Sequence, residues 1–199
     1  WRHATRALVR DCPLGPRLLA HTHGWAMEGG LVAASKGAPE AIAQLCSLAP
    51  EQRLSMDAQV NRMASGGLRV LGVAKAAFVG DAWPATAEEI RFDYLGLLAL
   101  ADPVRPTAAA AVKECRGAGI RGVMVTGDYP VTARAIANQI GLQQPDNVIS
   151  GSELRQLDER ALKECLKSVC VFARVLPEQK LRLIEAFRSN GEVVAMTGD

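Results

Sequence analysis

The stretch "GVMVTGDYPVTARAIANQIG", residues 122–141, contains a strand, a polar turn and a helix in direct succession. The apolar run at residues 123–125 is typical of a buried strand, and a threonine, a glycine and an aspartate follow it at residues 126–128. Apolar side chains then recur at helical spacing between Pro130, which suits a first helical turn, and Gly141, which suits a left-handed cap. This strand–turn–helix succession decides the fold class, because it is the repeating unit of a parallel sheet.

Strand-like and helix-like segments alternate in the same way from Phe92 onward. The sequence predicts strands at residues 92–102, 122–128, 147–150, 169–174 and 193–199, and helices at residues 108–119, 130–141, 152–166 and 177–191. Strands separated by helices of this length pair in parallel through right-handed crossovers, and the helices cover both faces of the sheet. We therefore predict an α/β fold with a Rossmann-like parallel sheet over residues 92–199.

Residues 1–91 show a different pattern. The sequence predicts strands at residues 30–37 and 69–79, with helices at residues 39–48 and 51–67 between them. A polar, proline-containing link, "GDAWPATAEEIRFD", then leads into the second part of the chain. We predict part of an α+β domain over residues 1–91 and a domain boundary close to Phe92.

Composition excludes several classes of protein. The 199 residues are 49% hydrophobic, which is enough for a packed core, and carry a formal net charge of +2. So small a charge, without a Lys/Arg run among aromatics, argues against nucleic acid as a partner. Apolar stretches such as residues 94–101 are far shorter than the roughly 20 residues of a membrane-spanning helix. Five separated cysteines without a C-x-x-C favour reduced thiols in a cytosolic setting.

The predicted strands of residues 92–199 are followed by a set of mostly polar residues. Doubly wound sheets bind ligands at this carboxyl edge. The set comprises Asp102, Thr126, Gly127, Asp128, Arg174 and Asp199, with Lys180 one turn into the helix after Arg174. It combines a hydroxyl that can bond an anion, two cations that can neutralise it and a carboxylate that can hold Mg²⁺. Helix starts at the same edge also favour anions, so the combination indicates phosphoryl chemistry.

Each of these residues also has an ordinary structural interpretation. Asp128 could cap the helix that follows it, Lys180 could be a solvated helix residue, and Asp102 before a proline could be a turn residue. Only the occurrence of all these residues at one edge of the sheet favours a functional site. The pair His21 and His23 has no third or fourth ligand at metal-site spacing, so an exposed or pocket-edge pair without metal is the better interpretation.

Five motifs in order resemble the cytosolic motifs of P-type cation-transporting ATPases, most closely those of the calcium-pump branch. They are "KGAPE" at residues 36–40, "DPVRP" at 102–106, "MVTGDYPVTARAIANQIG" at 124–141, "FARVLPEQK" at 172–180 and "AMTGD" at 195–199. The resemblance implies that residues 92–199 form the later part of a phosphorylation domain of the haloacid-dehalogenase type. It implies that residues 1–91 form the C-terminal part of a nucleotide-binding domain.

The resemblance also implies roles for single residues. ATP would phosphorylate an aspartate, and the making and breaking of this aspartyl phosphate would drive cation transport. Thr126 and Lys180 would stabilise the phosphoryl group, and Asp199 would hold Mg²⁺. The residues that would bind ATP include Thr126 again and are Lys36, Gly37, Arg69, Arg105, Thr126, Gly127 and Asp128. Asp102 and Arg174 would lie at the hinge or at the edge of the phosphate site.

The sequence departs from the family pattern in three places. The motif D-K-T-G-T, which contains the phosphorylated aspartate, is absent, and so are the membrane segments. The position of an aromatic that would stack on adenine is occupied by Leu14, with Trp25 as a poorer match. We expect an inactive, soluble fragment of a longer pump, whose parent carries this region on the cytosolic face of a membrane. Its partners there would be the actuator domain, the membrane domain and a cation of unassigned identity.

Two other functions remain open at this level. A soluble phosphohydrolase of the haloacid-dehalogenase type would explain Thr126, Lys180 and Asp199, but it would not explain "KGAPE" or "DPVRP". A non-catalytic nucleotide-binding module would need only Lys36 and Arg69. Titration with a nucleotide tests the second of these functions, because a nucleotide-binding module must bind the nucleotide.

Overall fold

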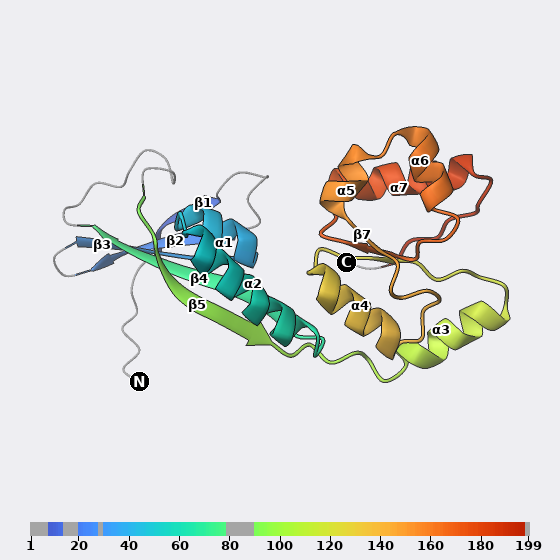
Figure 1. The fold of residues 1–199 in the computed structure, drawn as a ribbon, viewed down its shortest axis with the longest axis horizontal. Helices are drawn as coiled ribbons and strands as arrows, with labels where there is room; N and C mark the ends of the chain where they lie inside the picture. Colours follow the sequence, from blue (N-terminus) through green and yellow to red (C-terminus); the bar gives the residue numbers. More distant parts are fainter. Residues whose placement is uncertain (1–7, 14–19, 28–29, 79–89, 198–199) are drawn as a thin grey trace. The chain divides into compact units, whose positions relative to one another are not determined.

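The computed structural model describes residues 8–13, 20–27, 30–78 and 90–197. The chain forms two compact units, which are drawn in Figure 1. Unit 1 comprises Trp1–Met63 and Val70–Leu100, and unit 2 comprises Ala64–Arg69 and Ala101–Asp199. The short segment Ala64–Arg69 thus belongs to unit 2, although the chain around it belongs to unit 1.

Unit 1 is a five-stranded sheet with two helices. The strands lie in the order β1-β2-β3-β4-β5, and neighbouring strands from β1 to β4 are antiparallel. The strands are β1 (Leu8–Pro13), β2 (Ala20–Met27), β3 (Gly30–Gly37), β4 (Arg69–Phe78) and β5 (Asp93–Leu100), and the helices are α1 (Pro39–Leu45) and α2 (Pro50–Ala64). The strand and helix pattern predicted between residues 30 and 79 is confirmed.

Helix α1 packs closely against the sheet of unit 1. The side chain of Ile42 is fully buried, together with Ala33 and Ala74 from β3 and β4. A Cβ atom at Gly72 would lie only 2.8 Å from the Cβ atom of Ile42. The glycine and the alanines therefore bring the helix against the strands and leave no room for larger side chains.

Unit 2 contains a parallel sheet in the order β6-β8-β7, with helices on both faces (Figure 1). The strands are β6 (Met124–Val125), β7 (Val148–Ser150) and β8 (Val171–Ala173). The helices are α3 (Ala108–Gly117), α4 (Pro130–Gln139), α5 (Gly151–Gln156), α6 (Glu159–Cys165) and α7 (Pro177–Ser189). The predicted parallel sheet with two covered faces is confirmed.

Strand β8 lies in the centre of this sheet and contributes to two separate cores. Phe172 packs with residues of α5, α6 and α7, among them Leu154, Leu162 and Leu183. Its neighbours Val171 and Ala173 pack on the opposite face with residues of α4. All three β8 side chains are fully buried, as expected for a parallel strand between two layers of helices.

Strand β5 corrects the predicted organisation. The residues do form a strand, but it lies next to β4 in the sheet of unit 1 instead of joining the parallel sheet. Accordingly the compact units divide between Leu100 and Ala101, whereas the sequence placed the boundary at Phe92. An apolar strand pattern predicts a strand but does not identify its partner, because either sheet can accept it.

Two further expectations about unit 2 were wrong. Residues 193–197 form no strand, since no neighbouring strand pairs with them in the described part of the chain. The helix predicted at residues 152–166 is broken into α5 and α6. The break lies at Asp158, whose side-chain oxygen accepts a hydrogen bond from the N–H of Ala161 at 2.7 Å and begins the second helix.

Candidate functional site

The 126–128 loop, Thr126–Asp128, follows β6 directly and is held by its own side chains. The Thr126 hydroxyl donates a hydrogen bond to Asp128 Oδ2 at 3.0 Å and accepts one from the Asp128 N–H at 3.1 Å. The backbone N–H of Thr126 donates to the carbonyl of Phe172 in β8 at 2.9 Å. The loop is therefore anchored to the sheet at one end and closed on itself at the other.

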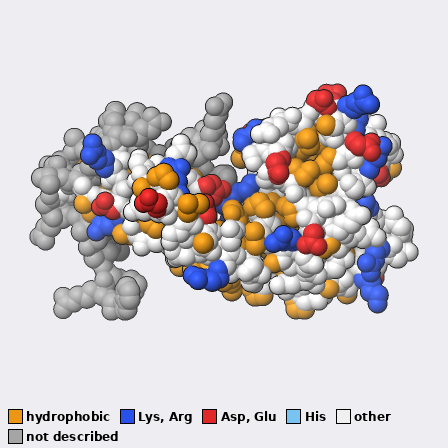
Figure 2. Space-filling model, viewed as in Figure 1, with side chains coloured by type: hydrophobic (Ala, Val, Ile, Leu, Met, Phe, Trp, Pro, Cys, Tyr) orange, Lys and Arg blue, Asp and Glu red, His pale blue; other side chains and the backbone are white. Residues whose placement is uncertain are grey.

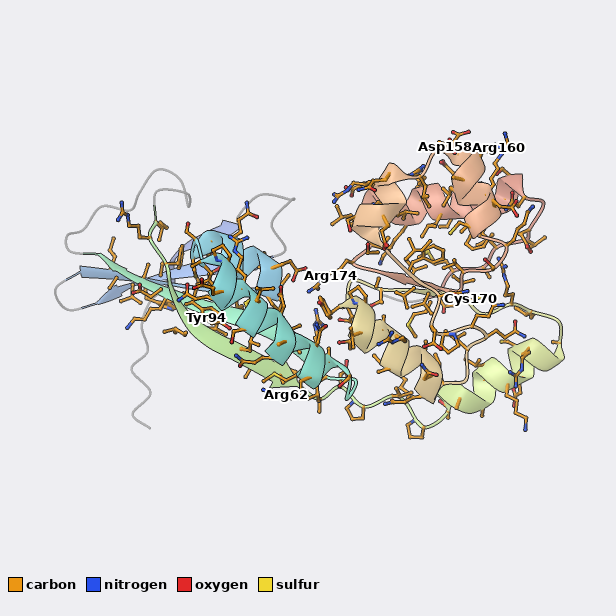
Figure 3. All side chains as sticks on the ribbon, viewed as in Figure 1. Arg62, Tyr94, Asp158, Arg160, Cys170 and Arg174 are labelled. Atoms are coloured by element: carbon orange, nitrogen blue, oxygen red, sulfur yellow. The ribbon has the colours of Figure 1, made fainter. Side chains whose placement is uncertain are left out.

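The 174–176 turn, Arg174–Leu176, follows β8 and bonds the 126–128 loop. The N–H groups of Arg174 and Val175 donate to the carbonyl oxygens of Asp128 and Thr126, both at 3.1 Å. The Arg174 guanidinium, labelled in Figure 3, donates to the carbonyl of Gly127 at 3.0 Å and lies 5.7 Å from the ring centre of Tyr129. The structure thus gives Arg174 a direct role in shaping the loop.

Arg174 has an unusual backbone conformation. Its φ angle is 53°, in the left-handed region that costs a side chain with a Cβ about 1–2 kcal/mol. This conformation lies directly after β8. The N–H groups on either side of it, those of Arg174 and Val175, both bond the 126–128 loop.

Lys180 lies in the first turn of α7, which begins at Pro177. Its N–H donates to the carbonyl of Leu176 at 3.2 Å, and its side chain is half-buried. The start of a helix of this length favours anions through its free N–H groups. A cationic side chain is therefore combined with the positive end of a helix dipole at the carboxyl edge of the sheet.

Arg69 belongs to the segment Ala64–Arg69 of unit 2 and lies beside Asp128. Its Nε is 3.6 Å from Asp128 Oδ1, although 61% of the arginine side chain remains exposed. The hydroxyl of Thr132 in α4 donates to the carbonyl of Leu68 at 2.8 Å and holds the segment in place. An ion pair with one member so exposed contributes at most about 1 kcal/mol, so a ligand could separate the two charges at little cost.

Gly127 is not required by the fold itself. A Cβ atom at this position would meet no other atom within 4 Å, and its φ angle is not in the left-handed region. The opposite is true of Gly151 at the start of α5, where a Cβ atom would lie 2.1 Å from the carbonyl oxygen of Arg174. The two glycines therefore mark an open position and an enclosed position at the same edge.

The other predicted site residues belong to unit 1, to the connection between β5 and α3, or to stretches outside the described residues. Lys36 and Gly37 end β3 in unit 1, where Lys36 is exposed. Asp102 and Arg105 are exposed in the connection between β5 and α3. The predicted magnesium ligand Asp199 and the position of Leu14 lie outside the described residues.

Sequence reasoning missed Gln179 and Gly151. Gln179 is buried, and its amide bonds both the N–H of Leu176 and the carbonyl of Gly151. A glutamine two residues after Pro177 is the usual third residue of a helix start, so this signal was present in the sequence. Nothing in the sequence indicated that Gly151 would meet Arg174, because residues 151 and 174 come together only through the fold.

Possible metal ligands are not clustered in the described residues, and three of the described thiols have raised pKa values. No three His, Cys, Asp or Glu side chains gather as a metal site in the described ranges. Burial and the nearby carboxylate of Asp93 raise the pKa of Cys46 to about 11, and burial raises the pKa of Cys165 and Cys170. These thiols therefore stay protonated at neutral pH and are poor nucleophiles. Acidic and basic side chains are interspersed over α5, α6 and α7 (Figure 2).

Comparison with protein families identifies the chain at the level of its class. Residues 31–199 match the model of the haloacid dehalogenase-like hydrolases. The chain belongs to this family of hydrolases. The parallel sheet of unit 2 agrees with this membership, and the predicted fold class is confirmed.

Curated relatives narrow the class further. The chain is 40% identical over 176 residues to "Probable cation-transporting ATPase I" of Mycobacterium leprae, an alignment that covers 82% of this chain and 11% of that protein. It is 37% identical over 177 residues to "Calcium-transporting ATPase" of Bacillus subtilis, with 83% and 20% covered. It is 38% identical over 156 residues to "Calcium-transporting ATPase 1" of Saccharomyces cerevisiae, with 76% and 16% covered.

The relationship to cation-transporting ATPases that the five motifs predicted is thereby confirmed. The chain spans 11–20% of the length of these relatives. Among the described residues, no helix is both long and apolar enough to cross a membrane.

Proposed function

We propose that this chain is the ATP-binding and phosphorylation region of a P-type cation-transporting ATPase. The observation that carries the proposal is the 126–128 loop, where Thr126 and Asp128 meet Arg69 and Arg174 at the carboxyl edge of the sheet. Hydroxyl, cationic and helix-dipole groups together are suited to a phosphoryl group. The cation-transporting relatives favour a pump over a soluble phosphohydrolase.

In this proposal the phosphoryl group lies between the 126–128 loop and α7. Thr126 turns its hydroxyl from Asp128 to a phosphoryl oxygen, and Lys180 neutralises the charge that develops on the phosphoryl group during transfer. The open position at Gly127 lets the phosphate approach the backbone, which explains a glycine that the fold does not demand. Asp199 would hold Mg²⁺, which supplies further charge neutralisation when it is bound.

We propose a second set of contacts for the nucleotide. Lys36 and Gly37 would bind the adenosine end of ATP, whereas Arg69 and Arg105 would bind its phosphates. Asp128, which already pairs with Arg69, would keep this arginine at the edge of the phosphate site. Asp102 would act in the hinge between the two units.

The remaining functions belong to the parent protein in this proposal. The phosphorylated aspartate of a D-K-T-G-T motif, the actuator domain and the membrane domain that carries the cation all lie beyond these 199 residues, and the region acts on the cytosolic face of the membrane. The chain alone is therefore expected to bind ATP without turning it over. Appreciable ATP hydrolysis by the purified chain would contradict this expectation.

Isothermal titration of the chain with a non-hydrolysable ATP analogue, with and without Mg²⁺, tests the proposal. We expect millimolar or tighter binding that weakens at least threefold in Lys36→Ala, Arg69→Ala and Lys180→Ala. The matched controls are Lys75→Ala, Arg91→Ala and Lys113→Ala, which remove exposed cations from elsewhere in the two units.

Each outcome of this titration has a separate meaning. Loss of affinity in the three site variants and not in the controls would support nucleotide binding at the proposed residues. Equal losses in site and control variants would indicate a general charge effect and would contradict the residue roles. No binding by the wild-type chain would contradict the proposal that this region suffices to bind ATP.

A further inference from the structure

Gln179 is a buried amide whose two ends are both hydrogen-bonded. The residue is 5% exposed, its Oε1 accepts from the N–H of Leu176 at 2.9 Å, and its Nε2 donates to the carbonyl of Gly151 at 2.6 Å. A buried amide is costly without partners, so the side chain favours a single arrangement of the groups that it bonds. One side chain thus joins the start of α7, the 174–176 turn and the start of α5.

Gly151 leaves no free space between the start of α5 and the 174–176 turn, two of the segments that Gln179 joins. A Cβ atom there would lie 2.1 Å from the carbonyl oxygen of Arg174 and 2.7 Å from Oε1 of Gln179. The start of α5 is therefore in direct backbone contact with the 174–176 turn. A shift of either segment would break the bond to Gln179 or force the two backbones together.

The segments that Gln179 joins also contact or contain the groups of the proposed phosphate site. From the 174–176 turn, the N–H groups of Arg174 and Val175 bond the 126–128 loop, and the Arg174 side chain bonds Gly127. Lys180 is the next residue after Gln179 and shares its helical turn. The two groups proposed to bind the phosphoryl group are thus connected to the same buried amide.

We propose that Gln179 is a positioning residue, which acts through Gly151 and the 174–176 turn to place both the 126–128 loop and Lys180. This inference rests on the proposed function, in which these two elements hold a phosphoryl group from opposite sides. Such sites need their groups placed to within about 0.5 Å, and that requires support from surrounding hydrogen bonds. Gln179 itself does not touch the phosphoryl group.

Amide hydrogen exchange of the 199-residue chain tests the inference without a ligand. Gln179→Met keeps the side-chain volume and removes both hydrogen bonds, whereas Gln179→Glu keeps the acceptor and removes the donor. We expect the N–H groups of Arg174 and Val175 to exchange at least tenfold faster in Gln179→Met, and at least as fast in Gln179→Glu, because the buried carboxylate would face the Gly151 carbonyl without a donor. The N–H groups of Leu183 and Phe187, later in α7, should keep their exchange rates.

The matched control is Gln156→Met, which changes an exposed glutamine at the end of α5. It should leave exchange at Arg174 and Val175 unaltered. Faster exchange of equal size throughout unit 2 would mean that Gln179 only stabilises the fold, and it would overturn the inference. Unchanged exchange at Arg174 and Val175 would overturn it as well.

Titration with inorganic phosphate, followed through the amide signals of Gly127 and Asp128, separates this inference from the function on which it rests. We expect the Kd of the wild-type chain to rise at least threefold in Gln179→Met and to stay constant in Gln156→Met. If Gln179→Met exchanges faster but the wild-type chain does not bind phosphate, the results would support the positioning role and contradict the phosphate site. Phosphate binding that Gln179→Met leaves unchanged would overturn the positioning and leave the proposed function intact.

Discussion

The 126–128 loop and the 174–176 turn lie at the same edge of one sheet but are built in opposite ways. The loop is polar, its glycine has open space around it, and its side chains bond mainly each other. The turn is enclosed by Gly151 and by the buried amide of Gln179, and it holds one residue in the left-handed region. The difference indicates that one segment is free to meet a ligand while the other supports it.

The largest expected effect on stability comes from adding a side chain at Gly151, the enclosed glycine. Gly151→Ala should lower the free energy of unfolding by about 3 kcal/mol, because the new Cβ atom would meet the Arg174 carbonyl and force the backbone to move. Urea denaturation measures this loss. Gly117→Ala at the end of α3, where a Cβ atom meets nothing within 4 Å, is the matched control and should not destabilise the chain. Equal stabilities of the two variants would refute the enclosure of Gly151.

A smaller effect is expected from the hydroxyl of the 126–128 loop. Thr126→Ala should lower the free energy of unfolding by about 1 kcal/mol, because the hydrogen bonds with Asp128 are lost at a half-buried position. Thr126→Ser keeps the hydroxyl and should recover most of this loss in the same urea measurement. A serine variant as unstable as the alanine variant would show that the methyl group, and not the hydroxyl, stabilises the loop.

The cap at the start of α5 should produce a small, pH-dependent effect. Hydrogen bonds from the side chain and backbone of Ser150 lower the pKa of Glu153, and this exposed carboxylate therefore stabilises the folded chain when it is ionised. Glu153→Gln keeps the shape of the cap and removes the charge. The variant should be less stable by about 0.5 kcal/mol or less at neutral pH, since water screens the exposed group.

The sign of this pH dependence follows from the direction of the pKa shift. The stabilisation by Glu153 is fully present above the ordinary pKa of glutamate and is lost as the pH falls through the lowered pKa of the folded chain. Unfolding curves of wild type and Glu153→Gln should therefore differ at neutral pH and converge in acid. A difference that grows on acidification would have the wrong sign for this cap.

The smallest effect on stability is expected at the open position. Gly127→Ala should change the free energy of unfolding by no more than about 0.5 kcal/mol, because its Cβ atom meets nothing and its backbone needs no left-handed conformation. The same variant should bind inorganic phosphate more weakly if a ligand uses this space. A loss above 1 kcal/mol in urea denaturation would mean that the fold, and not a ligand, requires this glycine.

Much of unit 2 was predictable from the sequence because its signals are local. Pro130 and Gly141 bound a helical pattern, and the apolar run before Thr126 indicates a buried strand whatever else surrounds it. The polar residues after β6 and β8 were likewise predictable as one edge, since parallel strands bring their carboxyl ends together. The structure brings Thr126, Asp128 and Arg174 to this edge.

Local sequence patterns did not predict which strand pairs with which neighbour. The residues of β5 carry a valid strand pattern, but their neighbour is β4. Residues 193–197 carry a similar pattern and form no strand, because a strand requires hydrogen bonds from a neighbour. The break between α5 and α6 depended on a single cap at Asp158 within a continuous helical pattern.

The sequence by itself determined the class of fold, the order of its elements and the chemical types at the carboxyl edge, since hydrophobic periodicity and turn residues act over short distances along the chain. Only the tertiary structure decided which sheet receives β5, which glycine is enclosed and which glutamine supports the 126–128 loop. Contacts such as those of Gly151 with Arg174 and Gln179 join residues far apart in the chain. Such contacts depend on packing in three dimensions, and no local pattern encodes them.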